Sequence, residues 1–251
     1  MIVPEVVTMT GHTAEGHQHG HRDDGGGHAH GPGGGHGDLD DMPEVLDAAY
    51  WDGRYRSRDA LWSGRPNPNL VAEATGLPPG RALDVGCGEG ADALWLAERG
   101  WEVIAVDISA VALARARAHA GEAPSGAGER VTWLERDLTT WDPPAARYGL
   151  VSAQYVHMPS GQRAGSFRKM VLSVAPGGTL LIVGHHPSDL DTTAMRPRRP
   201  DLFFTGEDVL GLLDPREWRI VVNEARGRPA TDPDGGAITV HDTVLRAERL
   251  V

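Results

Sequence analysis

The sequence predicts an α/β fold of the doubly wound, Rossmann-like type, with a mostly parallel seven-stranded sheet and an antiparallel last strand. Between residues 81 and 183, apolar runs of strand length alternate with helical stretches, which is typical of a parallel sheet covered by helices on both faces. A glycine-rich turn joins the first strand to the first helix. The last two apolar runs have only turn residues between them, so a β-hairpin is expected at the end of the sheet.

The individual elements follow in order along the chain. Helices are predicted at 91–99, 110–119 and 161–174, and Ser109 is expected to cap the second of them. Residues 232–236 (DPDGG) are expected to form the turn of the terminal hairpin. Strands are predicted where short apolar runs lie between charges or turn residues. The predicted strands are 81–85, 103–106, 131–134, 150–155, 180–183, 220–222 and 238–245.

The N-terminal 41 residues differ in composition from the rest of the chain. Residues 11–37 hold 11 glycines and 7 of the 12 histidines. Such a segment buries too little apolar surface to offset chain entropy, so residues 1–41 are expected to be a disordered tail and residues 42–251 one folded domain. Imidazoles bind zinc, nickel or copper, so loose divalent-metal binding by the tail stays open. No catalytic metal is expected there, because a flexible tract lacks fixed supporting hydrogen bonds.

Composition excludes several classes of function. The formal net charge of −11 argues against a nucleic-acid partner, since nucleic-acid binders normally present a basic surface. The single cysteine, Cys87, cannot form a disulfide within the chain. Apolar runs such as residues 180–183 are far shorter than the ~18 residues of a membrane span. The first residues lack the charged and apolar regions of a signal peptide, so we expect a cytoplasmic protein with no membrane partner.

Residues 82–91 (ALDVGCGEGA) are the most informative segment. A buried strand runs into a glycine-rich turn that opens a helix, and glycines allow the backbone to turn sharply and to approach a ligand closely. Gly86, Gly88 and Ala91 also satisfy the relaxed dinucleotide fingerprint. A nicotinamide cofactor, or a purely structural turn, therefore stays open on this motif alone.

Three acids at the ends of consecutive strands help to decide between these ligands. Asp84, two residues before Gly86, would repel a pyrophosphate and attract a ligand that carries an ammonium and a sulfonium. Asp107 follows the second strand, where a carboxylate accepts hydrogen bonds from both ribose hydroxyls. Asp137 follows the third strand and is placed to meet an adenine edge, directly or through the Leu138 amide. The three acids are expected to converge on the crevice at the carboxyl ends of the strands.

Together these residues resemble the class I S-adenosylmethionine-dependent methyltransferases. The resemblance rests on residues 83–90 (LDVGCGEG), 106–109 (VDIS), 137–138 (DL) and 175–180 (APGGTL), and it extends from about residue 50 to residue 249. It implies the Rossmann-like methyltransferase fold, S-adenosyl-L-methionine as cofactor and methyl transfer as the activity.

The resemblance also implies roles for particular residues. The positions of Gly86 and Gly88 pack against the methionine part with the assistance of Asp84, the position of Asp107 binds the ribose, and residues 137–138 bind the adenine. Cys87 is expected to pack within the cofactor loop and not to act as a nucleophile. The full expected cofactor set is Trp62, Asp84, Gly86, Cys87, Gly88, Asp107, Ile108, Asp137, Leu138 and Gln154.

Residues 42–78 are expected to form an N-terminal cap. Within them, residues 50–55 (YWDGRY) and 61–67 (LWSGRPN) resemble the cap of the tellurite-resistance and thiopurine methyltransferase-like branch. In that branch the cap lies over the cofactor, so the resemblance implies that Trp62 shields the methyl-transfer site. The alternative is that Trp51 and Trp62 only anchor a surface helix on the core. For Trp62, the sequence that follows it favours an ordered loop over a helix face.

The chemistry of transfer leaves the need for a base open. A thiolate or a reduced chalcogen needs none, whereas an oxygen or nitrogen nucleophile often does. His157 and His185 are the candidate catalytic bases, because they follow the fourth and fifth strands and histidine titrates near neutral pH. The alternative for His185 and its neighbour His186 is a strand cap or contact with solvent.

The acceptor is expected to be a small molecule, such as a thiol or a chalcogen compound. Residues 152–157 (SAQYVH) lack the Asn/Asp-Pro-Pro-Tyr signature of amino-methylating nucleic-acid enzymes. The basic side chains of Arg196, Arg198 and Arg199 either hold an anionic substrate or form a solvated charge run. The alternative functions from other classes are a nicotinamide-dependent oxidoreductase and a metal-handling protein that acts through its histidine-rich tail.

Overall fold

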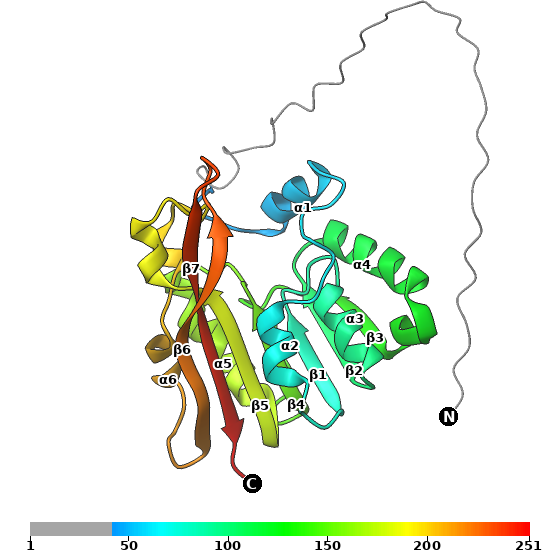
Figure 1. Ribbon diagram of the computed structural model, residues 1–251. Coiled ribbons are helices and arrows are strands. Elements are labelled where there is room, and N and C mark those ends of the chain that lie inside the picture. The colour runs from blue at the N-terminus through cyan, green and yellow to red at the C-terminus, as the bar shows by residue number, and fades with distance from the viewer. Residues whose placement is uncertain (1–41) are drawn as a thin grey trace, which may run out of the picture. The chain divides into compact units, whose positions relative to one another are not determined.

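The computed structural model describes residues 42–251, which fold around one seven-stranded sheet of order β3-β2-β1-β4-β5-β7-β6 (Figure 1). Strands β1 to β5 are parallel, and β7 runs antiparallel to both β5 and β6. The predicted fold class and the terminal hairpin are therefore confirmed. The histidine-rich tail predicted for residues 1–41 lies outside the described residues. The strands are β1 (Arg81–Val85), β2 (Glu102–Asp107), β3 (Val131–Glu135), β4 (Tyr148–Gln154), β5 (Val174–His185), β6 (Trp218–Thr231) and β7 (Ala237–Arg249).

The helices lie where the sequence predicts them, and further ones precede and follow. The Ser109 side chain accepts a hydrogen bond from the Ala112 amide at 3.1 Å, so the predicted cap is confirmed. None of the helices in the described part of the chain is long and apolar enough to cross a bilayer. The helices are α1 (Ala48–Arg56), α2 (Pro68–Ala74), α3 (Ala91–Glu98), α4 (Ala110–Glu122), α5 (Ser160–Ser173) and α6 (Gly206–Leu210), with 3₁₀ segments η2 (Pro124–Arg130), η3 (Pro187–Asp191) and η4 (Pro200–Leu202).

The terminal hairpin is longer than the sequence predicts. Strand β6 has 14 residues and β7 has 13, whereas the apolar runs predict only residues 220–222 and 238–245. Strand β6 lies at the edge of the sheet, and most of its side chains are exposed. An edge strand is held by main-chain hydrogen bonds along one side, so its polar side chains carry no apolar signal.

Two apolar layers pack on the two faces of the sheet and hold its central strands rigid. Leu83 of β1 lies in one layer and Ala82 in the other, as the alternation of a strand requires. A third, smaller cluster joins Met42, Leu202 and Phe203 to Trp51 of α1. Figure 1 shows α1 beside α4, at the end of the sheet where β1 and β2 finish. This end of the sheet contains the residues predicted to bind ligands.

Candidate functional site

The glycine turn after β1 is held in a conformation that only glycine adopts easily. Gly86 has φ +68° and Gly88 has φ +53°. A Cβ added at Gly86 would lie 2.8 Å from Val156 Cγ2, and one at Gly88 would lie 2.9 Å from Tyr55 Oη. The Gly86 amide donates to the Val106 carbonyl of β2 at 2.8 Å. The turn is therefore tied to β2 on one side, and side chains from α1 and from the loop after β4 lie against it.

Asp107 directs its carboxylate at this turn from the end of β2. Its Oδ2 accepts from the Gly88 amide and its Oδ1 from the Ser109 amide, both at 2.8 Å, and the residue is 8% exposed. Burial raises the pKa of Asp107, while the two amide bonds oppose that rise. Each carboxylate oxygen accepts more than one hydrogen bond, so this side chain retains acceptor capacity for a ligand hydroxyl.

Asp84 lies deeper, within β1, and is 1% exposed. Its Oδ2 has no hydrogen-bond partner among residues 42–251. Burial and the neighbouring carboxylates of Asp92 and Asp107 raise its pKa well above the usual range. A buried acceptor in a region of like charge is stabilised by a cationic donor and destabilised by a further anion.

The site therefore fits the expected cofactor better than a dinucleotide. S-adenosylmethionine carries an ammonium and a sulfonium, which complement the buried acids Asp84, Asp92 and Asp107, whereas a pyrophosphate would add negative charge beside them. Gln154 supplies a second acceptor of this kind, because its Oε1 is buried and unpartnered in the described chain. Its Nε2 donates to Ser152 Oγ at 3.0 Å, and Ser152 is the register partner of Asp84.

The raised pKa of Asp92 should make the stability of the fold depend on pH. Burial raises the pKa of Asp92 to about 6, although its carboxylate accepts from the Asn67 amide at 2.6 Å. The folded chain therefore holds this proton more tightly than the unfolded chain, so the stability contributed by Asp92 is full below pH ~4 and is lost as pH rises through 6. A shift of this size corresponds to about 3 kcal/mol. Asp92→Asn keeps the acceptor oxygen and removes the charge.

We expect Asp92→Asn to raise the thermal midpoint at pH 8 and to flatten its decline between pH 4 and pH 7. The measurement is thermal unfolding of both proteins across this pH range, compared as a difference so that other titrating groups cancel. Superimposable pH profiles for the two proteins would show that Asp92 carries no raised pKa.

The remaining predicted cofactor residues lie around the same end of the sheet. Asp137 uses its Oδ1 to accept from the Thr139 amide at 2.8 Å, so part of this carboxylate closes the turn after β3. Leu138 is 5% exposed and packs in the core, and Ile108 is partly buried after β2. Cys87 is buried, and burial together with the nearby acids raises the pKa of its thiol. A neutral, buried thiol at this position fits a packing role.

Trp62 lies in the loop between α1 and α2, so the predicted loop is confirmed. Its ring is 48% exposed, and its Nε1 donates to the Tyr55 hydroxyl at 2.9 Å. Both groups lie against Gly88, where an added Cβ would be 2.9 Å from Tyr55 Oη and 3.3 Å from Trp62 Nε1. Tyr55, which the sequence analysis did not single out, is therefore the buried partner that orients Trp62 over the glycine turn.

The two candidate bases are brought together from β4 and β5. The rings of His157 and His185 lie 5.4 Å apart between centroids. Trp51 of α1 lies 5.7 Å from His157, while Tyr155 and Phe203 lie 4.9 Å and 5.6 Å from His185. The sequence predicts a cap or anchor role for Trp51, but the packing of Tyr155 and Phe203 against His185 was not predicted, because no motif marks either ring. The result is a continuous ring cluster beside the glycine turn, since Val156 contacts Gly86.

Both histidines are neutral at pH 7. Burial, with the positive charges of Arg54 and Arg196, lowers the pKa of His157 to about 4. Burial and the neighbouring His157 hold the pKa of His185 well below its usual range. Within the described residues, the buried His185 Nδ1 has no hydrogen-bond partner. Tyr155, whose ring packs against His185, has φ +52°, a left-handed conformation that costs a non-glycine residue about 1–3 kcal/mol and is typical of functional sites.

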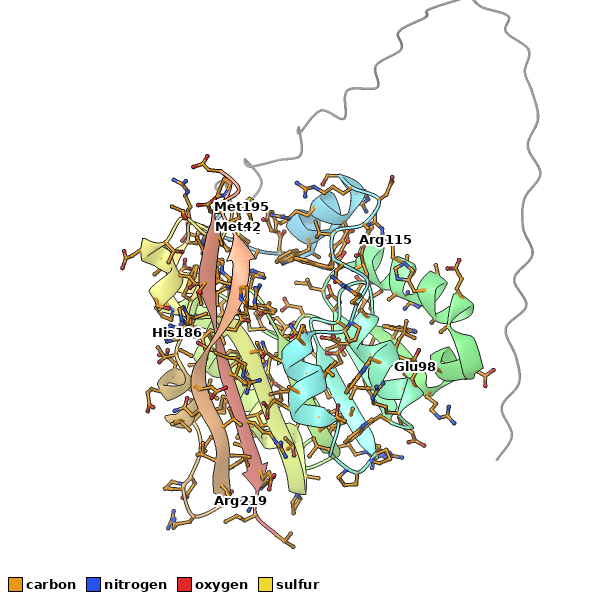
Figure 2. All side chains as sticks on the ribbon, viewed as in Figure 1. Met42, Glu98, Arg115, His186, Met195 and Arg219 are labelled. Carbon is orange, nitrogen blue, oxygen red and sulfur yellow. The ribbon has the colours of Figure 1, made fainter. Side chains whose placement is uncertain are left out.

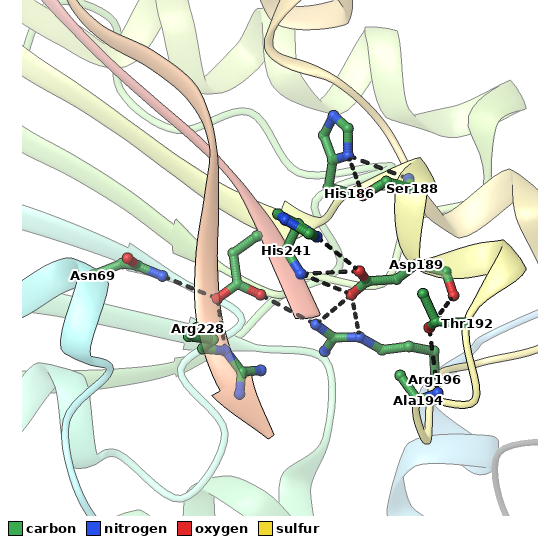
Figure 3. Close-up of polar contacts among 10 residues, drawn as sticks. Asn69, His186, Ser188, Asp189, Thr192, Ala194, Arg196, Arg228 and His241 are labelled. Atoms are coloured by element: carbon green, nitrogen blue, oxygen red, sulfur yellow. Dashed lines mark hydrogen bonds and ion pairs between the residues drawn. The ribbon is translucent and has the colours of Figure 1, made fainter. Parts of the chain in front are cut away.

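The structural alternative holds for His186 and for two of the three arginines. His186 Nδ1 accepts from the Ser188 amide at 3.2 Å and caps η3. Arg196 donates to the buried carboxylates of Asp189 and Asp242 at 2.9 Å and 3.3 Å (Figure 3). Arg199 pairs with Asp201 and with main-chain carbonyls near residue 43. The interpretation of Arg196 and Arg199 as an anion clamp is wrong, because their donors are already committed inside the protein.

Metal chemistry receives no support from the part of the chain that the structure describes. Residues 42–251 contain no group of three or more His, Cys, Asp or Glu side chains placed to hold a metal ion. The histidine-rich tail lies outside that range.

Comparison with known proteins agrees with this site. Residues 82–178 match the family model described as a methyltransferase domain. A 2-heptyl-1-hydroxyquinolin-4(1H)-one methyltransferase from Mycobacteroides abscessus is 31% identical over 138 residues, which are 52% of this chain and 60% of that protein. Thiocyanate methyltransferase 1 from Brassica oleracea is 32% identical over 105 residues, which are 41% of this chain and 46% of that protein. The chain thus spans about half the length of these curated relatives.

Solved structures show the same fold. The crystal structure of TehB from Haemophilus influenzae superposes with a TM-score of 0.60 over 81% of this chain and 67% of that chain, at 16% identity. At that identity the likeness shows the fold alone.

Proposed function

We propose that the chain is a class I S-adenosylmethionine-dependent methyltransferase, which its matched domain and its fold support, and that it methylates a small acceptor with a soft, already ionised sulfur or chalcogen atom. The observation that carries the proposal is the pair of neutral histidines, His157 and His185, beside the glycine turn. The cofactor supplies an electrophilic methyl group on a sulfonium, and the acceptor displaces it in line.

The residues around the turn bind and orient. Asp84 offers a buried, unpartnered oxygen to the ammonium of the methionine end, and Asp107 accepts from the ribose hydroxyls. Tyr55 and Trp62 lie against Gly88 and exclude water from that end of the site. Alignment and exclusion of water supply about 7–11 kcal/mol in well-oriented reactions, so no covalent enzyme intermediate is required.

The histidines restrict the acceptor to one that is ionised before it binds. A free thiol has a pKa near 8.5, and His157 has a pKa of about 4, so moving the proton from thiol to imidazole costs about 6 kcal/mol. The neutral rings of His157 and His185 therefore accept a hydrogen bond or contact the acceptor, but they are weak bases. The nearby positive charge of Arg54 favours an anion at this place.

The relatives support acceptors of this chemical class. The name of the Brassica oleracea protein gives thiocyanate as its acceptor, which is a sulfur anion at neutral pH. The name of the Mycobacteroides abscessus protein gives 2-heptyl-1-hydroxyquinolin-4(1H)-one, a compound that contains no sulfur. An acceptor series must therefore include both types.

The test is a methyl-transfer assay of the full chain with S-adenosylmethionine, thiocyanate, a set of thiols of graded pKa, and the hydroxyquinolone. At pH 7 we expect kcat/KM to fall about threefold for each unit by which the thiol pKa exceeds 7, because the thiolate fraction falls about tenfold while the nucleophilicity of the thiolate rises about threefold. The pH profile should follow the ionisation of the acceptor. His157→Asn should lower kcat/KM without moving the inflection of that profile.

Two results would contradict the proposal. One is turnover of the hydroxyquinolone alone, and the other is an inflection that disappears in His157→Asn, which would make His157 a true general base. Titration of the full chain with S-adenosylhomocysteine and with NADH tests the identity of the cofactor independently of the acceptor. Only S-adenosylhomocysteine is expected to raise the thermal midpoint.

A further inference from the structure

A buried ion pair connects the glycine turn to the loop that follows α1. Glu89, in the turn, is 5% exposed. Its Oε2 accepts from the Trp62 amide at 3.1 Å and its Oε1 from the Leu61 amide at 3.3 Å. Arg115 of α4 donates from Nη1 to the same Oε1 at 2.8 Å. The Glu89 carboxylate thus bonds the loop and α4 at once.

Arg115 also makes hydrogen bonds to the other end of the same loop. Its Nη2 donates to the carbonyl of Tyr55 at 2.5 Å and to the carbonyl of Arg58 at 2.6 Å. Figure 2 labels Arg115 on α4, the helix that contacts α1. We name Glu89 and Arg115 the clasp, because together they bond main-chain atoms at both ends of residues 55–62. A planar guanidinium reaches these acceptors simultaneously, which a lysine ammonium does not.

The clasped segment carries the side chains that lie on the glycine turn. Tyr55 Oη and Trp62 Nε1 would be 2.9 Å and 3.3 Å from a Cβ at Gly88, and the Gly88 amide bonds Asp107. The position of the segment therefore determines how closely these rings cover the predicted ribose site. Glu89 and Arg115 both make hydrogen bonds to main-chain atoms of residues 55–62. An ion pair that only stabilised the fold would not need to concentrate its contacts on this one segment.

A separate attachment holds α1 when the clasp is open. Asp52 Oδ1 accepts from Ser109 Oγ at 2.7 Å and from the Val111 amide at 3.2 Å, both at the start of α4. The main-chain bonds of the clasp involve residues 55–62, beyond Asp52 along the chain. Residues 57–62, which carry Trp62, can therefore move away from the turn while α1, which carries Tyr55, stays on α4.

We infer that Glu89 and Arg115 are positioning residues that hold residues 55–62 as a cover over the cofactor site, through Tyr55 and Trp62. This rests on the proposed function, because the cover acts on S-adenosylmethionine. The cofactor enters when the segment is released, and the clasp closes it. The acceptor meets the ring cluster at His157 and His185, which the clasp does not touch.

Limited trypsin digestion of the full chain tests the clasp without any activity. Arg56 and Arg58 lie in or beside the clasped segment and offer cleavage sites. We expect Arg115→Gln and Glu89→Gln to be cleaved there at least tenfold faster than the wild type. Arg117→Gln is the matched control, because Arg117 lies on the same helix and donates to the Trp133 carbonyl instead. Equal cleavage of wild type and both variants would overturn the inference.

Steady-state kinetics distinguish positioning from simple loss of stability. In Arg115→Gln we expect the KM for S-adenosylmethionine to rise at least tenfold, while the KM for the acceptor changes less than threefold. Arg115→Lys keeps the positive charge, so its KM for S-adenosylmethionine should lie between those of the wild type and Arg115→Gln. Equal rises in both KM values with a lowered thermal midpoint would overturn the positioning role. If the wild type binds no S-adenosylhomocysteine, the proposed function is wrong. The trypsin comparison still tests whether Glu89 and Arg115 hold residues 55–62 in place.

Discussion

Asp107→Ala is expected to lower the affinity for S-adenosylhomocysteine by a factor of 10² to 10⁴. The Asp107 carboxylate ends β2 and is proposed to accept from the ribose hydroxyls, and hydrogen bonds to a charged group contribute about 1.5–3 kcal/mol each. The substitution also removes the acceptor of the Gly88 and Ser109 amides, so the turn itself loosens. Isothermal titration of the full chain at pH 7.5 gives the comparison.

A matched control separates the ribose contact from general loss of charge. Glu135 ends β3, is the register partner of Asp107 and is exposed. Glu135→Gln is expected to change the affinity less than twofold. Asp107→Asn keeps one oxygen acceptor and should lose less than Asp107→Ala. An Asp107→Ala protein that is folded and binds within threefold of the wild type would show that this carboxylate does not hold the ribose.

Asp189→Ala is expected to lower the free energy of unfolding by about 3–5 kcal/mol, the cost of leaving a buried charge without its partner. The Asp189 side chain is fully buried and accepts from Arg196 Nε and Nη2 at 3.0 Å and 2.9 Å and from the His241 amide at 2.9 Å (Figure 3). Arg196 is itself only 9% exposed in its side chain, so water does not replace the lost carboxylate. Urea unfolding at pH 7 measures the change.

The exposed Asp191, two residues on, provides the control. Asp191→Ala should change the unfolding free energy by no more than about 0.5 kcal/mol. The double variant Asp189→Ala, Arg196→Met should recover part of the loss, because it also removes the buried Arg196 charge, which keeps only the longer contact to Asp242. A loss below 1 kcal/mol in Asp189→Ala would mean that the carboxylate is not the anchor of η3 on β7.

Short-range patterns explain what could be predicted. The strand–turn–helix segment around residues 82–91 and the acid after each strand depend on local backbone geometry and on the rule that parallel strands end at one edge. These features placed Asp84, Gly88 and Asp107 at one site before the fold was known. The fold class followed from the same alternation, since each element is short and locally specified.

Long-range pairing explains what could not be predicted. Glu89 is visible as an acid within a glycine turn, yet its partner Arg115 lies 26 positions away with no motif around it. Arg196 lies in a basic stretch of sequence that suggests an anion site. The carboxylates that bind its guanidinium come from η3 and β7, which are distant in sequence. Most of β6 carries polar side chains, so only its ladder with β7 identifies it as a strand.

Residues that are neighbours along the chain specify the five parallel strands, the glycine turn and the three acids at the strand ends, so these features can be predicted without the fold. Only the tertiary structure decided the protonation of His157 and His185, the commitment of Arg196 to the interior and the clasp between Glu89 and Arg115. Burial and pairing decide these properties, and both depend on which distant segments meet when the chain folds.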